Sequence, residues 1–134
     1  MFFQKLIEHI AFTISSKANL NSADLTAAFL QSASLVGALL PYADLGSSIL
    51  LAANLTSADL TSANLQGAEL REAKLNNAKL VNANLEGADL TGADLTGANF
   101  ANANGLDPVT PGASITHQQL ARLDNSVYEL QQHS

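Results

Sequence analysis

The chain has 134 residues, which is enough for one domain. Hydrophobic residues make up 47% of it and aromatic residues only 5%, because the apolar content is mainly Ala and Leu, with 23 of each. This composition argues against a core built around large side chains. The absence of Cys excludes disulfides and thiolate metal sites. The net charge of −6 argues against binding to nucleic acid through phosphate contacts.

Residues 1–17 precede the regular part of the sequence, and we expect them to form an N-terminal capping segment. Large apolar residues recur there at near-helical spacing, which predicts a short amphipathic helix that covers the start of the regular part. Glu8 and His9 interrupt the apolar run and no small-x-small cleavage site follows cleanly, so a signal peptide is disfavoured. No stretch reaches the roughly 18 apolar residues of a membrane span. We expect a cytoplasmic protein, with export or a lumenal location of a processed chain left open.

The middle of the chain is a five-residue repeat. From Leu20 to Phe100 a large apolar residue recurs every five positions, and 16 of these 17 residues are Leu. The residue two positions before each of them is Ala, except for Ser48. The residue between the two is Asp or Asn in ten of the 17 cases. The repeat therefore occupies residues 18–104.

A period of five fits neither common element, because a helix repeats every 3.6 residues and a strand every two. It fits a square coil in which each unit forms one side, with Ala and Leu inside and polar residues outside. Four units complete a turn, so residues 20 apart stack in inner ladders, one of which is Leu20, Leu40, Leu60, Leu80 and Phe100. The outer Gly, Asn, Asp and Ser residues suit tight turns at the corners.

The run Ala-(Asp/Asn)-Leu-x-x resembles the pentapeptide-repeat family over residues 18–104. The resemblance implies a right-handed quadrilateral β-helix, an all-β solenoid with ladders of Leu or Phe inside. Seventeen units correspond to about four coils. The resemblance also implies a bacterial, cyanobacterial-like protein, from a family most of whose members have no known biochemical activity.

Residues 105–134 are expected to form a turn-rich linker and a C-terminal amphipathic helix. Two Pro and two Gly residues between positions 105 and 112 end the repeat. Residues 116–119 have the Thr-x-x-Gln pattern of a capping box at a helix start. The apolar stripe of this helix consists of Leu120, Leu123, Val127 and Leu130. The helix either covers the last coil or mediates dimerisation or partner binding, since an apolar stripe suits both roles.

Outward positions between residues 29 and 51 break the polar pattern of the repeat. The apolar residues there are Phe29, Val36, Leu39, Pro41, Tyr42, Ile49 and Leu51. Phe29 and Ile49 are 20 residues apart and should stack on one face. From the sequence we expect one exposed apolar patch on the first two coils. It is either covered by the N-terminal segment or serves as a protein-interaction surface, which includes a homodimer contact; binding of a small molecule is a third alternative.

No catalytic, cofactor-binding or metal site is predicted. His9, His117 and His133 all lie outside the repeat and far apart in the sequence. The carboxylates of the repeat stand on an outer wall, without a cleft that would exclude water, as acid-base chemistry requires. The Gly-Gly-x-Gly-x-Asp nonapeptide of calcium-binding β-helices is missing.

These observations favour a rigid, non-enzymatic scaffold for protein-protein interaction whose partner the sequence does not name. The alternative is an acidic DNA mimic that binds DNA gyrase, because the resemblance implies this role for some long, dimeric relatives that protect gyrase from quinolones. Three basic residues, Arg71, Lys74 and Lys79, interrupt the acidic charge of the repeat. A column about 20 Å tall is also short for such a mimic. Neither a cofactor nor direct contact with nucleic acid is expected.

Overall fold

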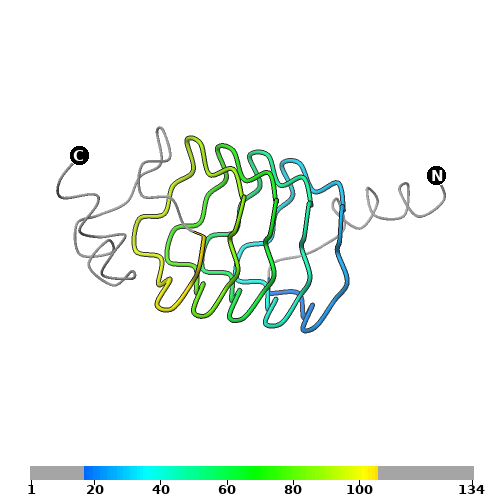
Figure 1. Cartoon of the computed structure of the whole chain (residues 1–134), viewed down its shortest axis with the longest axis vertical. Helices are drawn as coiled ribbons and strands as arrows, with labels where there is room; N and C mark the ends of the chain where they lie inside the picture. Colours follow the sequence, from blue (N-terminus) through cyan, green and yellow to red (C-terminus); the bar gives the residue numbers. More distant parts are fainter. Residues whose placement is uncertain (1–16, 106–134) are drawn as a thin grey trace.

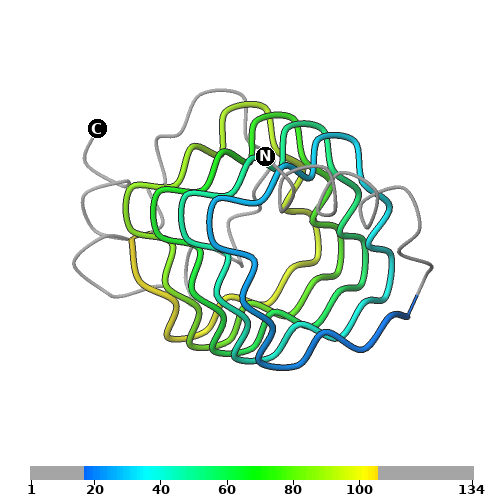
Figure 2. The same ribbon diagram turned by 90° about the vertical axis from the view of Figure 1, so that its right-hand side faces the viewer.

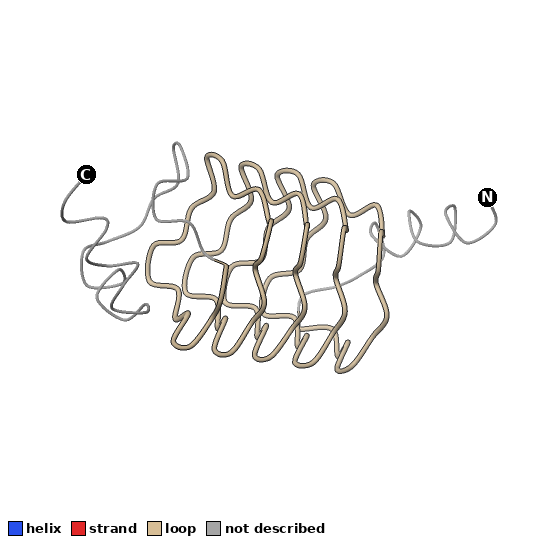
Figure 3. Ribbon diagram, viewed as in Figure 1, coloured by secondary structure: helices blue, strands red, loops and turns tan. Residues whose placement is uncertain are grey.

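The computed structural model describes residues 17–105. These residues form a coil that completes one turn every 20 residues (Figure 1). Its turns are stacked along one axis, and each turn repeats the outline of the one before it (Figure 2). These residues contain no continuous helix or strand, as Figure 3 shows. Each side of the coil is too short for a strand, so the turns are joined by isolated parallel β-bridges.

The bridges form four ladders that run along the axis, one on each side of the coil. Each ladder joins residues 20 positions apart, as the five-residue period predicts. We name each ladder, and the face it lies on, by its first residue. The four ladders contain Asn19, Leu39, Asp59, Lys79 and Asn99; Asp24, Asp44, Asn64, Asn84 and Asn104; Phe29, Ile49, Glu69 and Asp89; and Ser34, Asn54, Lys74 and Asp94.

Backbone hydrogen bonds join each turn to the next and also close each corner. The N–H of Leu20 donates to the carbonyl of Leu39 in the next turn (2.7 Å), and the N–H of Leu39 donates back to the carbonyl of Ala18 (2.8 Å). At the corner, the N–H of Ala23 donates to the carbonyl of Leu20 (3.0 Å). This pattern recurs along the coil, so each turn is the template for the next one.

The core is a set of stacked Leu and Ala side chains. Leu30 to Leu80 at every fifth position are at most 1% exposed, and Phe100 continues the same arrangement at 1%. The Ala residues two positions earlier are equally buried in most units. The structure thus confirms the predicted four-sided coil with ladders of apolar side chains inside.

Every corner places its second residue in the left-handed region of backbone conformation. Position 17 and every fifth residue up to 102 have φ between 55° and 76°. Gly occupies five of these positions, including Gly67 and Gly97, where the missing Cβ removes the strain. Ser, Asn and other residues occupy the rest, so the fold imposes positive φ at corners whatever side chain is present.

The predicted capping segment of residues 1–17 lies almost wholly outside the described residues, and so does the helix expected beyond residue 105. The described part of the chain holds no helix long and apolar enough to cross a membrane.

Candidate interaction surfaces

In the ten units that have Asp or Asn before the inner residue, this side chain accepts a hydrogen bond from the backbone of the following corner. Of the five N–H groups in a unit, the ladders and the corner bond use all except that of the residue after Leu. At Asp59, Oδ1 accepts this remaining N–H from Thr61 (3.0 Å) and also the Thr61 hydroxyl (2.6 Å). The side chain thus closes an Asx turn over the corner.

The same bond forms at all ten positions where Asp or Asn precedes the inner residue of a unit. The acceptors are Asn19, Asp24, Asp44, Asn54, Asp59, Asn64, Asn84, Asp89, Asp94 and Asn99. A unit with another residue at this position lacks the bond, which is worth about 0.5–1.5 kcal/mol in folded proteins.

Three apolar residues stand where this acceptor is expected: Phe29, Leu39 and Ile49. Phe29 and Ile49 have no side-chain oxygen for the N–H two residues later. After Leu39 the residue two positions on is Pro41, which has no N–H to satisfy. Phe29 and Ile49 therefore stand in place of a stabilising polar side chain. At Leu39 no hydrogen bond is lost, because Pro41 has no N–H to donate.

The structure divides the seven predicted patch residues between two opposite faces. Phe29 and Ile49 are bridged to each other on one face, and Leu51, which is 41% exposed, follows at its edge. Leu39 belongs to the ladder of Asn19, two sides of the coil away. The single patch expected from the sequence is therefore corrected to two, because sequence neighbours in this coil diverge by a quarter turn every five residues.

The second surface surrounds Leu39, which is 43% exposed. Val36 lies at the corner before it, and Pro41 and Tyr42 form the corner after it. Tyr42 is 66% exposed and has φ 61°, a conformation that bulky residues rarely adopt and that costs about 1–2 kcal/mol. The positive φ itself is common to all described corners, and Tyr42 differs from the other corner residues in carrying an exposed aromatic ring.

Charged residues continue the Phe29 ladder beyond its apolar half. Ile49 is bridged to Glu69, and Glu69 to Asp89. Hydrogen bonds from the side chain and backbone of Thr91 hold the pKa of Asp89 below its ordinary value, and Arg71 contributes to the same effect. The Nε of Arg71 lies 3.9 Å from Oδ2 of Asp89, and both side chains are exposed, so this ion pair is weak.

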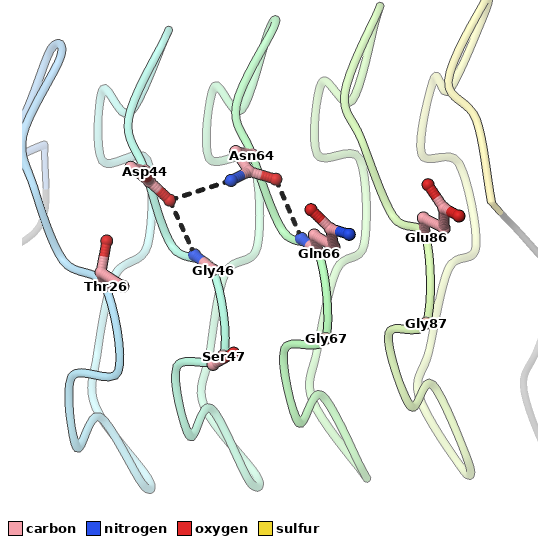
Figure 4. Close-up of a pocket in the computed structure, with 9 residues that line it drawn as sticks. All are labelled: Thr26, Asp44, Gly46, Ser47, Asn64, Gln66, Gly67, Glu86 and Gly87. Carbon is pink, nitrogen blue, oxygen red and sulfur yellow. Dashed lines mark hydrogen bonds between the residues drawn. The ribbon is translucent and has the colours of Figure 1, made fainter.

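An open groove of about 560 Å³ follows the corner between the Asp24 and Phe29 faces (Figure 4). Figure 4 shows that the Asp44 and Asn64 side chains are joined, with Nδ2 of Asn64 donating to Oδ1 of Asp44 (3.0 Å). The groove exists because small residues occupy successive corners. Its lining consists of Thr26, Asp44, Gly46, Ser47, Asn64, Gln66, Gly67, Glu86 and Gly87.

Ser48 replaces the usual Ala of the repeat, and the structure shows what this does to the core. It is fully buried where the other units have Ala, and its hydroxyl has no hydrogen-bond partner in the structure. Burial of an unpaired hydroxyl opposes folding. Ser48 lies in the unit that carries Ile49, so this unit departs from the repeat at two of its positions.

Residues 17–105 contain no group of three His, Asp or Glu side chains that could hold a metal ion. The three His residues and the stripe of the expected C-terminal helix, Leu120, Leu123, Val127 and Leu130, lie outside the described residues. The role of that helix as a cap or a dimer contact therefore stays a prediction.

The family model of pentapeptide repeats matches residues 18–50, 42–77 and 68–104, in eight copies. These residues make up about two thirds of the sequence, so the chain belongs to the pentapeptide repeat family. Proteins of this family form right-handed quadrilateral β-helices. None of the curated protein sequences compared with this chain is significantly similar to it.

Solved structures show the same fold. A pentapeptide repeat protein from the thylakoid lumen of Arabidopsis thaliana is 28% identical, over 79% of this chain and 70% of its own, with a TM-score of 0.67. Rfr23 from the cyanobacterium Cyanothece 51142 is 42% identical, over 66% of this chain and 57% of its own, with a TM-score of 0.56. QnrB1, a plasmid-mediated fluoroquinolone resistance protein, is 24% identical over 76% and 49%, with a TM-score of 0.69, which shows similarity of fold alone.

Proposed function

We propose that this protein is a rigid, non-enzymatic scaffold for protein-protein interaction. The observation that carries the proposal is the presence of Phe29 and Ile49 on the surface, at positions where Asp or Asn would stabilise the coil. Each substitution gives up an Asx hydrogen bond worth about 0.5–1.5 kcal/mol. Selection for stability alone would favour the polar residue, so the apolar side chains have another use. Contact with a partner is the use that a partly exposed apolar surface, extended by the exposed Leu51, supports.

The proposal is tested by affinity capture from the lysate of the native host, read by mass spectrometry. Wild type is compared with Phe29→Asn/Ile49→Asn and with Leu39→Asn/Tyr42→Asn. Asn restores the acceptor at positions 29 and 49, so we expect the first variant to be at least as stable as wild type. Loss of one captured protein with one variant supports the proposal. The same proteins captured by all three, or none captured by wild type, would reject it.

The acidic DNA mimic is the alternative, and the charge distribution opposes it. Among the described residues, Lys17, Arg71, Lys74 and Lys79 are spread over the walls of the coil. The likeness to QnrB1 concerns the fold and carries no activity to this chain. A gyrase supercoiling assay separates the two functions: the scaffold proposal expects no inhibition at micromolar protein.

Homodimerisation and a cytoplasmic location stay predictions within this proposal. Light scattering of the full chain measures the first. Fractionation of host cells measures the second, for which the lumenal relative from Arabidopsis is a reason to include every compartment.

A further inference from the structure

The Phe29 face has a two-part composition along the coil axis. Its first two positions are the apolar Phe29 and Ile49, and its last two are the acidic Glu69 and Asp89. Phe29, Ile49 and Asp89 are partly exposed, and Glu69 is exposed. The division is therefore between an apolar half on the first two coils and an acidic half on the next two.

The corners beside this face reinforce the division. Leu51 extends the apolar half at one edge. Glu72 and Glu86 lie at the two edges of the acidic half, and Glu86 also lines the groove. Arg71 is the basic residue in this region, at 3.9 Å from Asp89. Four acidic residues against one basic residue leave a net charge of −3 on this half.

The spacing of the ladder suits a helix better than an extended peptide. Adjacent coils of a parallel β-stack are about 4.8 Å apart. One helical turn rises about 5.4 Å, so side chains on successive turns of one helix face nearly match this spacing. In an extended peptide, side chains on one face are about 6.8 Å apart. The four positions span about 14 Å, which corresponds to about ten residues of helix.

We infer that the Phe29 face, with Glu69 and Asp89, is the docking site for a partner helix whose contacting face carries two apolar turns followed by two turns with Lys or Arg. The inference rests on the proposed function and specifies the chemistry of the partner. The apolar turns cover Phe29 and Ile49. The basic turns complement the carboxylates and compete with the exposed Arg71 for Asp89. Charge complementarity thus fixes the direction of the helix along the coil.

The probe is a fluorescein-labelled, alanine-based helical peptide with Leu at positions i and i+4 and Arg at i+7 and i+11. A control peptide has Glu in place of both Arg residues. Binding to the full chain is followed by fluorescence anisotropy. We expect saturable binding of the Arg peptide, at least tenfold weaker binding of the Glu peptide, and weakening of the Arg peptide as salt is raised.

Two double variants test the two halves separately. Phe29→Asn/Ile49→Asn removes the apolar half. Glu69→Gln/Asp89→Asn lowers the net charge of the acidic half from −3 to −1, and Asn at position 89 keeps an acceptor for the N–H of Thr91. Each is expected to bind the Arg peptide at least tenfold more weakly than wild type, and salt should weaken binding to the second less than it weakens binding to wild type. Leu39→Asn/Tyr42→Asn, on the opposite face, is the matched control and should bind as wild type does.

Equal affinity of wild type and either test variant, or no saturable binding of the Arg peptide to wild type, overturns the inference. Stability of each variant is measured by urea unfolding, so that a misfolded protein is recognised. Failure of the inference differs from failure of the proposed function. A host protein captured by wild type and by both test variants, but lost with Leu39→Asn/Tyr42→Asn, would overturn the helix site while the scaffold function stands.

Discussion

Asp59 offers a direct test of the role assigned to the Asx bond. It accepts both the N–H and the hydroxyl of Thr61, at 3.0 and 2.6 Å, and it is partly buried. Asp59→Ala removes both bonds and leaves the N–H of Thr61 without its acceptor. A hydrogen bond to a charged group contributes about 1.5–3 kcal/mol, and water partly replaces it at this site, so we expect a loss of about 1–2 kcal/mol.

Asp59→Asn is the matched variant, because Asn forms the same bond elsewhere in the coil, for instance at Asn54, where Oδ1 accepts the N–H (3.1 Å) and hydroxyl (2.6 Å) of Thr56. We expect it to change the free energy of unfolding little at neutral pH. Urea unfolding followed by circular dichroism measures both variants, and a changed midpoint with an unchanged slope identifies a change in stability.

The pH dependence adds a second readout. Burial raises the pKa of Asp59, but the hydrogen bonds from Thr61 and the charge of Lys79 outweigh it, so the pKa is lowered in the folded protein. A lowered pKa stabilises the fold above the unfolded value of about 3.9, and this contribution is lost as pH falls through the folded value. The stability advantage of wild type over Asp59→Ala should therefore shrink below about pH 4, whereas the difference between Ala and Asn at this position should not depend on the titration of Asp59. If Ala and Asn at position 59 are equally stable at pH 7, the Asx bond does not stabilise the coil.

Three further predictions concern the core and the corners. Leu60→Lys places an unpaired charge at a fully buried position, so the far-UV circular dichroism spectrum at 25 °C should lose its β signal; a folded and equally heat-stable variant would contradict the square coil. Ser48→Ala removes the unpaired buried hydroxyl and should raise the free energy of unfolding by about 1 kcal/mol in urea, whereas destabilisation would mean that the hydroxyl is bonded. Tyr42→Asn places at this corner a residue that tolerates positive φ and should stabilise by about 1 kcal/mol in urea unfolding; no gain would show that the Tyr conformation is not strained.

The interior of this fold could be predicted from the sequence because one period determines it. Leu60 and its equivalents recur every five residues, and only a four-sided coil buries all of them while pairing residues 20 apart. The stacking of charges was predictable for the same reason: the ladders bridge Asp59 to Lys79 and Lys74 to Asp94, as residues 20 positions apart require.

The exterior could be predicted less well, because it depends on angular position rather than on nearness in sequence. Leu39 is ten residues from both Phe29 and Ile49, and ten residues are half a turn, so these side chains face opposite ways. The bond from the N–H of Thr61 to Asp59 was also beyond sequence reasoning. It becomes visible only when every other N–H of the unit has been assigned to a ladder or a corner.

The four-unit turn has a consequence for how such a protein can change during evolution. Duplication of a single five-residue unit between Ile49 and Glu69 would leave every Leu inside, since any unit fits any side of the coil. It would also rotate all later outward residues by a quarter turn, and Glu69 would no longer be bridged to Ile49. Duplication of four units would preserve every face and lengthen the column. The coil itself tolerates unit insertions of either kind, whereas a binding face that spans several turns survives only those that come in multiples of four.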